Sequence, residues 1–175
     1  YRFDQLYYVD MPQNVFLSSE LLDMTRARVF EMFDSPGDTL PRIFIDRDPE
    51  VPRRRLADRE NALKVLRRHD VIPIFCEEYD FEQQIKLFRG VRLLAGLHGA
   101  GMSNMLFCEP GTPILILDYK WPSEMFALAT TLDLNVFLLK AEQMHAEGVE
   151  QRLQDLRVEA QQLDAALESL RRLIS

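Results

Sequence analysis

Residues 93–119, LLAGLHGAGMSNMLFCEPGTPILILDY, determine the fold that the sequence predicts. The apolar run 93–97 leads into a glycine turn, 98–101, and then into a segment of helical character, 102–107. A Pro-Gly turn and a second apolar run, 114–117, follow. Strand, glycine loop, helix and strand in this order are typical of α/β anion sites, because glycine lets the backbone approach a ligand and a helix start offers unpaired N–H groups.

The flanking sequence extends this unit into an alternating series. Ser18, Asp58 and Asp80 are predicted N-caps, and Gln83 completes a capping box with Asp80. An extended connection near 6–9, a turn at 11–14 and a helix stop at 35–38 are also predicted. The remaining predicted elements are helices at 18–33, 58–69, 80–88 and 123–132 and strands at 42–46, 71–75 and 135–139.

Five predicted strands after residue 41 alternate with helices, which indicates an α/β fold with a mostly parallel, Rossmann-like sheet in three layers. We assign this domain to residues 1–141, with an N-terminal part that is a candidate interdomain linker. Ligands of such sheets bind beyond the carboxyl ends of the strands. Arg47, His98 and Asp118 are all expected at that edge.

The tail has a different pattern. Apolar residues from Val149 to Ile174 are separated by alternating steps of four and three, which predicts a long amphipathic or coiled-coil helix within 142–175. Such a seam has to be covered. Two ways of burying it remain open. The seam could pair with a partner helix, including one from a second copy in a homodimer, or pack within the same polypeptide.

Composition limits the classes of function. The 175 residues carry a net charge of -7, which argues against a general nucleic-acid binder, and no apolar run is long enough to span a membrane. Cys76 and Cys108 have no partners at metal-ligand spacing, and there is no Asn-x-Ser/Thr sequon. A cytoplasmic location fits best. Because the chain starts at Tyr1 without a signal-peptide pattern, we expect it to be excised from a longer polypeptide.

The glycine loop does not fit two familiar patterns. It lacks the G-x-G-x-x-G fingerprint of dinucleotide-binding proteins. It is similar to an esterase oxyanion loop, but the chain has no G-x-S-x-G nucleophile elbow to accompany it. A purely structural turn is one interpretation, and His98 and Asn104 beside the glycines favour a ligand site.

The segment 42–70 is basic within an acidic protein, with nine Lys or Arg residues against six acids. Arginine forks suit phosphate oxygens, so Arg47 and the cluster 53–55 are candidate phosphate ligands, whereas Lys64, Arg67 and Arg68 fit a solvated helix face. Asp46-Arg47-Asp48 matches a D-x-D metal motif. The central cation disfavours a metal, and pairing of the carboxylates with local arginines is the better interpretation.

Four motifs in order carry a family resemblance: RIFIDR (42–47), the arginine cluster, EQQIKLF (82–88) and the stretch 93–119. Together they resemble the family 61 glycosyltransferases over about residues 18–118. That family includes bacterial capsular-polysaccharide enzymes, plant xylan-decorating transferases and eukaryotic extracellular O-GlcNAc transferases. The matching positions are Arg47, Arg54, Arg55, Gln84, His98, Gly99, Ala100, Gly101 and Asn104.

The resemblance implies a GT-B fold, an inverting reaction and a UDP-sugar donor bound by the C-terminal of two Rossmann-like domains. It also implies a nucleotide-sugar and a glycan acceptor as partners, an N-terminal acceptor domain outside this chain, and no metal cofactor. Two positions depart from the family pattern. Asp58-Arg59 stands where Asn-Glu is common, and Asp46 replaces a small hydroxyl residue.

Our leading hypothesis is the donor-binding half of an inverting glycosyltransferase, bacterial and active in surface-polysaccharide synthesis, with attachment to the membrane periphery through other parts of the chain. Arg47 and Arg54 or Arg55 would neutralise the diphosphate, Gln84 and Asn104 would position the donor, and Asp118 would contact the ribose. His98 is a candidate ligand for a phosphate or sugar hydroxyl and the one candidate catalytic residue. The competing hypothesis is a catalytically inactive Rossmann-like module that dimerises through Val149–Ile174.

Overall fold

The computed structural model describes residues 18–33, 40–48, 50 and 54–173. The predictions for 6–9, 11–14 and 35–38, and those for Arg53 and Ile174, lie outside the described residues. Within this described part, no helix combines the length and the apolar composition that a membrane span requires.

A five-stranded parallel sheet forms the centre of the molecule. Its strands are β1 (Arg42–Ile45), β2 (Ile72–Ile74), β3 (Leu93–Leu97), β4 (Pro113–Asp118) and β5 (Asn135–Lys140), in the order β2-β1-β3-β4-β5. Each neighbouring pair is parallel, with Ile43 opposite both Ile72 and Leu94. β3 and β4 are buried along their whole length, as continuous apolar runs between two helical layers should be. The predicted α/β class and parallel sheet are confirmed.

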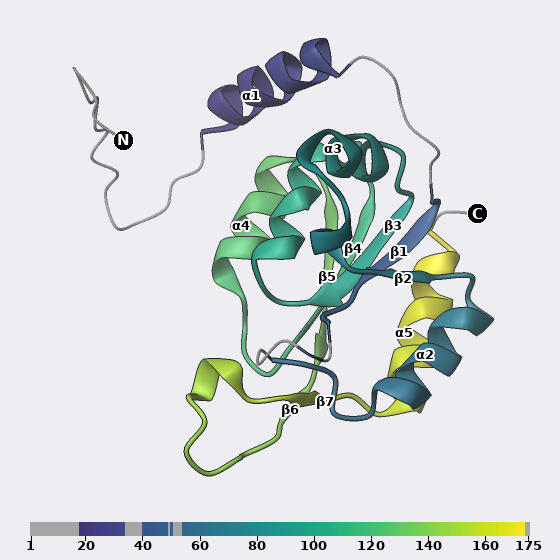
Figure 1. Ribbon diagram of the computed structural model, residues 1–175. Coiled ribbons are helices and arrows are strands. Elements are labelled where there is room, and N and C mark those ends of the chain that lie inside the picture. The colour runs from purple at the N-terminus through teal and green to yellow at the C-terminus, as the bar shows by residue number, and fades with distance from the viewer. Residues whose placement is uncertain (1–17, 34–39, 49, 51–53, 174–175) are drawn as a thin grey trace.

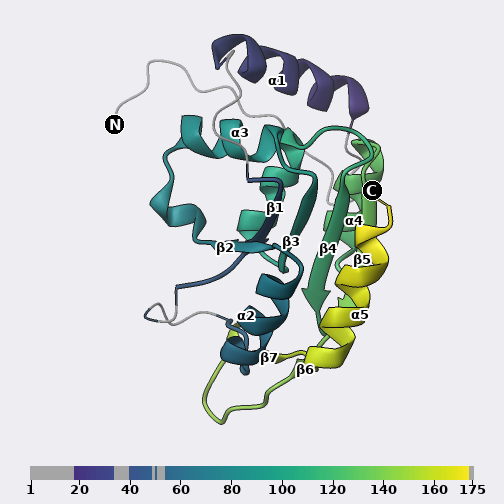
Figure 2. The same cartoon turned by 90° about the vertical axis from the view of Figure 1, so that its right-hand side faces the viewer.

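Helices cover both faces of this sheet (Figure 1). One face carries α1 (Ser19–Met32), α3 (Phe81–Arg89), the 3₁₀ helix η2 (Ala100–Phe107) and α4 (Ser123–Thr131), packed on Ile43, Ile114 and Ile116. The other carries α2 (Arg59–Arg68) and α5 (Ala160–Arg171), packed on Phe44, Leu115 and Leu117. Figure 2 looks onto this second side.

The connection from β1 to β2 and the connection from β2 to β3 lie on opposite faces of the sheet. The chain leaves β1 through α2 to reach β2, then returns through the short 3₁₀ helix η1 (Cys76–Glu78) and α3 to β3 on the other side of β1. In open α/β sheets, such a change of direction leaves a crevice at the carboxyl ends of the two adjacent strands from which the chain turns in opposite directions, here β1 and β3. The crevice between the ends of β1 and β3 is therefore the candidate site.

Local sequence signals explain the starts of α1 and α3. The Ser18 hydroxyl accepts from the Leu21 amide at 3.3 Å, and Asp80 and Gln83 form the predicted capping box with both bonds at 2.8 Å. Asp58 occupies the N-cap of α2, but its side chain accepts from Asn61 Nδ2 at 2.8 Å and makes no cap bond. The prediction that Asp58 caps α2 is wrong in this respect.

The helix expected at 102–107 starts two residues earlier and is 3₁₀ in form. The Met102 amide donates to the Gly99 carbonyl at 2.9 Å, which tightens the first turn. Met102 and Met105 pack in the core between the sheet and the helices of the α3 face, and both are fully buried. The tight turn thus anchors the glycine loop to the core.

The prediction of one long heptad helix from Val149 to Ile174 is wrong. The segment 142–173 contains β6 (Glu142–Gln143), the 3₁₀ helix η3 (Gln151–Leu153), β7 (Leu156–Arg157) and then α5, which has 12 residues. Backbone pairing competes with helix here. The Leu156 amide donates to the Arg55 carbonyl at 2.8 Å, the Ala57 amide donates to the Leu156 carbonyl at 2.8 Å, and β6 pairs with β7.

The apolar seam of the tail packs within the same chain. Leu156, Leu163, Leu167 and Leu170 are at most 3% exposed and join the core on the α2 side of the sheet. Without α5, the side chains of β4 that face this side, including Leu115 and Leu117, would be in contact with water. Because these leucines already cover the sheet, they offer no seam for the dimerisation that the competing hypothesis requires.

Candidate functional site

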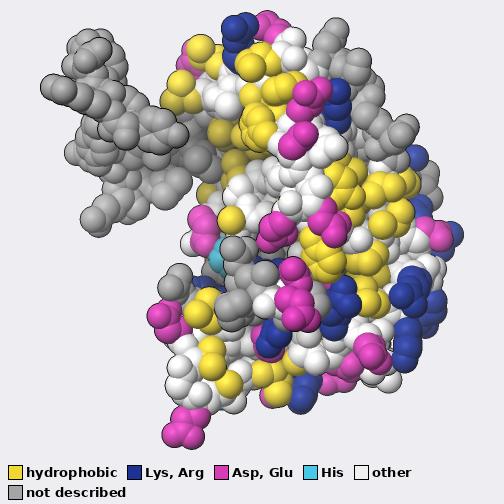
Figure 3. All heavy atoms as spheres, viewed as in Figure 1, with side chains coloured by type: hydrophobic (Ala, Val, Ile, Leu, Met, Phe, Trp, Pro, Cys, Tyr) yellow, Lys and Arg dark blue, Asp and Glu magenta, His cyan; other side chains and the backbone are white. Residues whose placement is uncertain are grey.

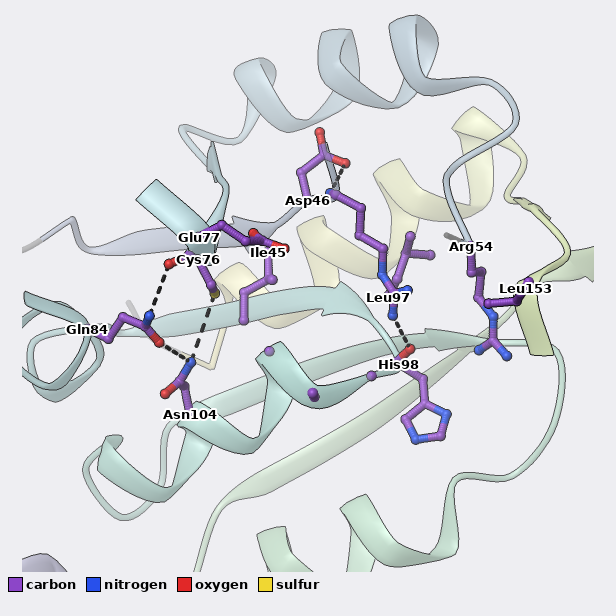
Figure 4. Close-up of a pocket in the computed structure, with 14 residues that line it drawn as sticks. Ile45, Asp46, Arg54, Cys76, Glu77, Gln84, Leu97, His98, Asn104 and Leu153 are labelled. Atoms are coloured by element: carbon purple, nitrogen blue, oxygen red, sulfur yellow. Dashed lines mark hydrogen bonds between the residues drawn. The ribbon is translucent and has the colours of Figure 1, made fainter. Parts of the chain in front are cut away.

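A cavity of about 720 Å³ lies at the crevice between the carboxyl ends of β1 and β3. Eight of the ten predicted site residues line it: Arg47, Arg54, Gln84, His98, Gly99, Ala100, Gly101 and Asn104. The other lining residues are Ile45, Asp46, Cys76, Glu77, Leu97 and Leu153. Residues separated by more than a hundred positions in the sequence thus meet at one edge of the sheet (Figure 4).

Arg47 follows β1 and reaches across to the glycine loop after β3. Its Nη2 atom donates to the His98 carbonyl at 2.9 Å. A Cβ atom built on Gly99 would overlap Nη2 and would lie 3.3 Å from Cζ of Arg47. A side chain at position 99 would occupy the place of the guanidinium group, so glycine leaves Arg47 room to reach the loop. The structure therefore explains why the arginine and the glycine occur together.

The glycine loop presents backbone donors toward the same cavity. The Met102 amide is used within η2, whereas the amides of Ala100 and Gly101 have no bond to another described residue. Gly101 is also tightly placed, since an added Cβ would lie 3.0 Å from Cγ2 of Ile45. Two amides beside an arginine form a site suited to an anion.

Asp46 lies in the wall of the cavity, and its carboxylate is paired with an arginine. It is 3% exposed; Oδ1 accepts from the Arg47 amide at 2.8 Å, Oδ2 accepts from Nε of Arg59 at 2.8 Å, and Nη2 of Arg59 forms an ion pair with Oδ2 at 2.8 Å. This is the local pairing that the sequence favoured over a D-x-D metal site. It also joins two positions that depart from the family pattern, because Asp46 and Arg59 are partners.

Asp118 lies beneath the cavity, not in its wall. It is fully buried and accepts from His98 Nδ1 at 2.7 Å, from Arg54 Nη1 at 3.3 Å and from the Tyr119 amide at 2.8 Å. Burial alone would raise the pKa of Asp118, but the hydrogen bonds from His98 and Tyr119 and the nearby positive charges hold the pKa below the ordinary value of 3.8. Asp118 thus orients two residues that line the cavity.

His98 is held at both ring nitrogens. Nδ1 faces Asp118, and Nε2 lies 2.9 Å from Oε1 of Glu124, the second residue of α4. Carboxylates accept hydrogen bonds, so only the doubly protonated ring satisfies both at once. The side chain of Glu124 is 52% exposed and free of the core, so a ligand that takes its place gains access to Nε2. Nothing in the sequence pointed to Glu124, which lies on a separate helix.

The tail holds Arg55, which directly follows the cavity residue Arg54. Arg54 is 6% exposed and lines the cavity, with its guanidinium 5.3 Å from the centre of the Tyr119 ring. Arg55 points elsewhere: its amide donates to Asp155 Oδ1 at 2.9 Å, and its Nη2 lies 3.4 Å from Asp155 Oδ2. Leu153 also lines the cavity. These contributions had no local signal, because they depend on pairing between segments a hundred residues apart.

Two polar residues close the opposite end of the cavity. Gln84 on α3 bonds to Asn104 on η2 at 2.9 Å, as Figure 4 shows. Cys76 lies beside them, and burial together with the nearby Glu77 carboxylate raises the pKa of its thiol to about 11. The thiol is therefore protonated at neutral pH and is not a nucleophile.

Other basic residues of the segment 42–70 lie away from the cavity. Lys64, Arg67 and Arg68 on α2 are exposed. Figure 3 shows Lys and Arg side chains gathered on the right-hand side of this view, where α2 lies in Figure 1. This distribution matches the solvated helix face predicted for them.

Comparison with known proteins adds an independent observation. The family described as Glycosyltransferase 61 matches residues 1–115 of the chain. This range contains β1, β2, β3 and every predicted site residue except Asp118, and it ends inside β4. No curated protein matches the chain significantly.

Proposed function

This chain belongs to glycosyltransferase family 61, and from that premise we propose that it binds a nucleotide-sugar, with UDP as the nucleotide, in the cavity between β1 and β3. The observation that carries the proposal is the position of Arg47. Its guanidinium lies on the glycine loop, bonded to the His98 carbonyl, and the loop has a glycine where a side chain would displace it. A fixed cation beside free amides suits the diphosphate of such a donor.

Sugar transfer from a nucleotide requires stabilisation of the departing diphosphate. We propose that Arg47, Arg54 and the amides of Ala100 and Gly101 supply it without a metal ion. Arg54 is held by Asp118 and Tyr119, so little reorganisation is needed as negative charge develops. In this arrangement the protein contributes prepared positive charge in place of a divalent cation.

An inverting displacement also needs a base for the acceptor hydroxyl. His98 is engaged by Asp118 and Glu124 at its two nitrogens, which favours a role in binding over that of the base. We propose that the base and the glycan-binding surface come from an acceptor domain of a GT-B arrangement. The chain described here then acts as the donor-binding half.

Isothermal titration with UDP tests the proposal. We expect the wild-type chain to bind UDP with millimolar or tighter affinity and Arg47→Ala to weaken binding about tenfold or more, since a charge-assisted hydrogen bond contributes roughly 1.5–3 kcal/mol. Arg67→Ala removes the same charge from the exposed face of α2 and is the matched control. Wild-type protein that binds no UDP at millimolar concentration refutes the proposal, and unchanged affinity of Arg47→Ala removes this residue from the site.

A further inference from the structure

Two carboxylates hold the two ring nitrogens of His98, and they differ in burial. Nδ1 lies 2.7 Å from Oδ2 of Asp118, whose side chain is 0% exposed, and Nε2 lies 2.9 Å from Oε1 of Glu124, whose side chain is 52% exposed. An ion pair in contact with water contributes little to stability, whereas breaking a buried pair costs far more. The Asp118 contact is therefore the fixed one, and the Glu124 contact is the one that a ligand can exchange.

Glu124 can leave His98 with little disturbance of the fold. Its second carboxylate oxygen, Oε2, accepts only a long hydrogen bond from the Ser123 hydroxyl, 3.4 Å away in an exposed contact. After release, the carboxylate would remain in the first turn of α4, where the helix dipole stabilises negative charge. The ring would stay in place, because Asp118 holds Nδ1 from the buried side.

The ring and the backbone of His98 face different partners at the same edge of the sheet. The carbonyl oxygen accepts from Arg47 Nη2 at 2.9 Å, and His98 lines the same cavity as Arg54 and the glycine loop. In Figure 4 the labelled ring points from the end of β3 toward the green helix, α4, which carries Glu124. Asp118 is bonded to both Arg54 and His98. Glu124 is thus the exchangeable negative charge beside the proposed anion site.

We propose that Glu124 is an internal anion that competes with the ligand for His98. The inference rests on the proposed function: the Glu124 carboxylate holds Nε2 until a phosphate oxygen of UDP takes its place. The exchange preserves the hydrogen bonding of the ring, since both groups accept from the same N–H. Because a ligand gains His98 only by displacing Glu124, this residue lowers the affinity of the site for phosphate groups that do not also engage the rest of the cavity.

Isothermal titration of UDP into the 175-residue chain measures the competition. Glu124→Gln keeps the size of the side chain and removes the charge, so we expect it to raise UDP affinity about two- to fivefold, the range expected for loss of one exposed ion pair. Asp133→Asn is the matched control. It removes the same charge between α4 and β5, at the amino ends of the strands, and should leave UDP affinity unchanged. An affinity that Glu124→Gln leaves unchanged or lowers, or that both variants raise equally, overturns the inference.

Nitrogen NMR of the imidazole rings separates competition from a general effect of charge. The chain has three histidines, which keeps the spectrum simple. Without UDP, Glu124→Gln should shift the His98 ring signals, because the partner of Nε2 changes. With saturating UDP, wild type and variant should give the same His98 signals, since phosphate has replaced residue 124 in both.

The two levels of the proposal fail in different ways. If UDP binds and the His98 signals of the saturated proteins still differ as much as those of the proteins without UDP, residue 124 stays on the ring. The contact is then structural, and the inference about Glu124 is wrong while UDP binding stands. A wild-type chain that binds no UDP at millimolar concentration instead refutes the proposed function itself.

Discussion

Replacing Asp118 by Asn should reveal how much the buried charges beneath the cavity contribute to stability. Asp118 is fully buried and interacts with Arg54 at 3.3 Å and with His98 at 2.7 Å. The Arg54 side chain is itself only 7% exposed. Asn preserves the size of the side chain and one acceptor oxygen but removes the negative charge, so the buried guanidinium of Arg54 loses the ion pair with Asp118.

The magnitude follows from that burial. Breaking a buried ion pair by removal of one partner costs about 3–5 kcal/mol, and the oxygen that Asn retains places our expectation near the lower limit, about 3 kcal/mol. For a chain of this length, 1 kcal/mol corresponds to roughly 2–4 °C in Tm, so Asp118→Asn should lower Tm by about 6–12 °C. UDP binding should weaken as well, because Arg54 loses its fixed position.

The pH dependence has a definite sign. The pKa of Asp118 in the folded protein lies below the ordinary value of 3.8, so the folded state favours the ionised form. The resulting stability is present above the pKa of the unfolded chain and is lost as pH falls from about 4 through the folded pKa. Asp164 has a lowered pKa of the same sign, through the hydrogen bond from His69, so the wild-type curve contains both contributions.

Thermal unfolding of wild type, Asp118→Asn and Asp133→Asn between pH 3 and pH 8 checks this prediction. Asp133 is exposed and sits at φ 56, a conformation that Asn adopts readily, so its substitution removes a charge without a buried partner. The difference between wild type and Asp118→Asn should be largest at neutral pH and should shrink below about pH 4. A neutral-pH loss no larger than that of Asp133→Asn, or a difference that is independent of pH, would refute the assigned role of Asp118.

Three further predictions follow. Gly99→Ala should weaken UDP binding about as much as Arg47→Ala, because the new methyl group displaces the guanidinium, and the double variant should be no weaker than Arg47→Ala; additive losses would contradict the shared cause. Leu167→Ala should destabilise folding by about 2–5 kcal/mol in chemical denaturation, since this side chain is 2% exposed in the core, whereas an unchanged midpoint would show that α5 is detachable. Cys76, with its pKa raised to about 11, should react with iodoacetamide more slowly at pH 7.5 than a free cysteine does, and a rate equal to that of free cysteine would show that the thiol is not protected.

The strands and most helices could be predicted because their signals are local. Continuous apolar runs identified β3 and β4, which are buried on both faces, and the pattern Asp80–Gln83 identified a helix start that depends on three neighbouring residues. The motifs with glycine and arginine identified seven residues that line one cavity, since the carboxyl ends of parallel strands lie at the same edge, and the motif EQQIKLF added Gln84. The same logic placed Asp118 at the correct edge but not at the correct depth.

The heptad prediction failed because a spacing rule carries no information about competing partners. Steps of four and three across 149–174 fit a helix, but residues 155–157 gain more from backbone bonds to Arg55, Ala57 and β6. Asp118 likewise lies at the end of β4, where a solvent-facing site residue is expected. Arg54 and His98 pack against it, however, and it is buried. In each case the deciding partner lies far away in the sequence.

By itself, the sequence determined the parallel α/β sheet, the family and the glycine loop with its arginine, because each depends on local patterns of apolar and turn-forming residues. Tertiary structure alone decided that the tail covers the sheet, that Glu124 and Leu153 reach the site, and that Gln84 holds Asn104 through a hydrogen bond. Hydrogen-bond direction and burial depend on which groups are in contact in the folded protein. Those contacts join residues that are far apart in the sequence, so local patterns do not predict them.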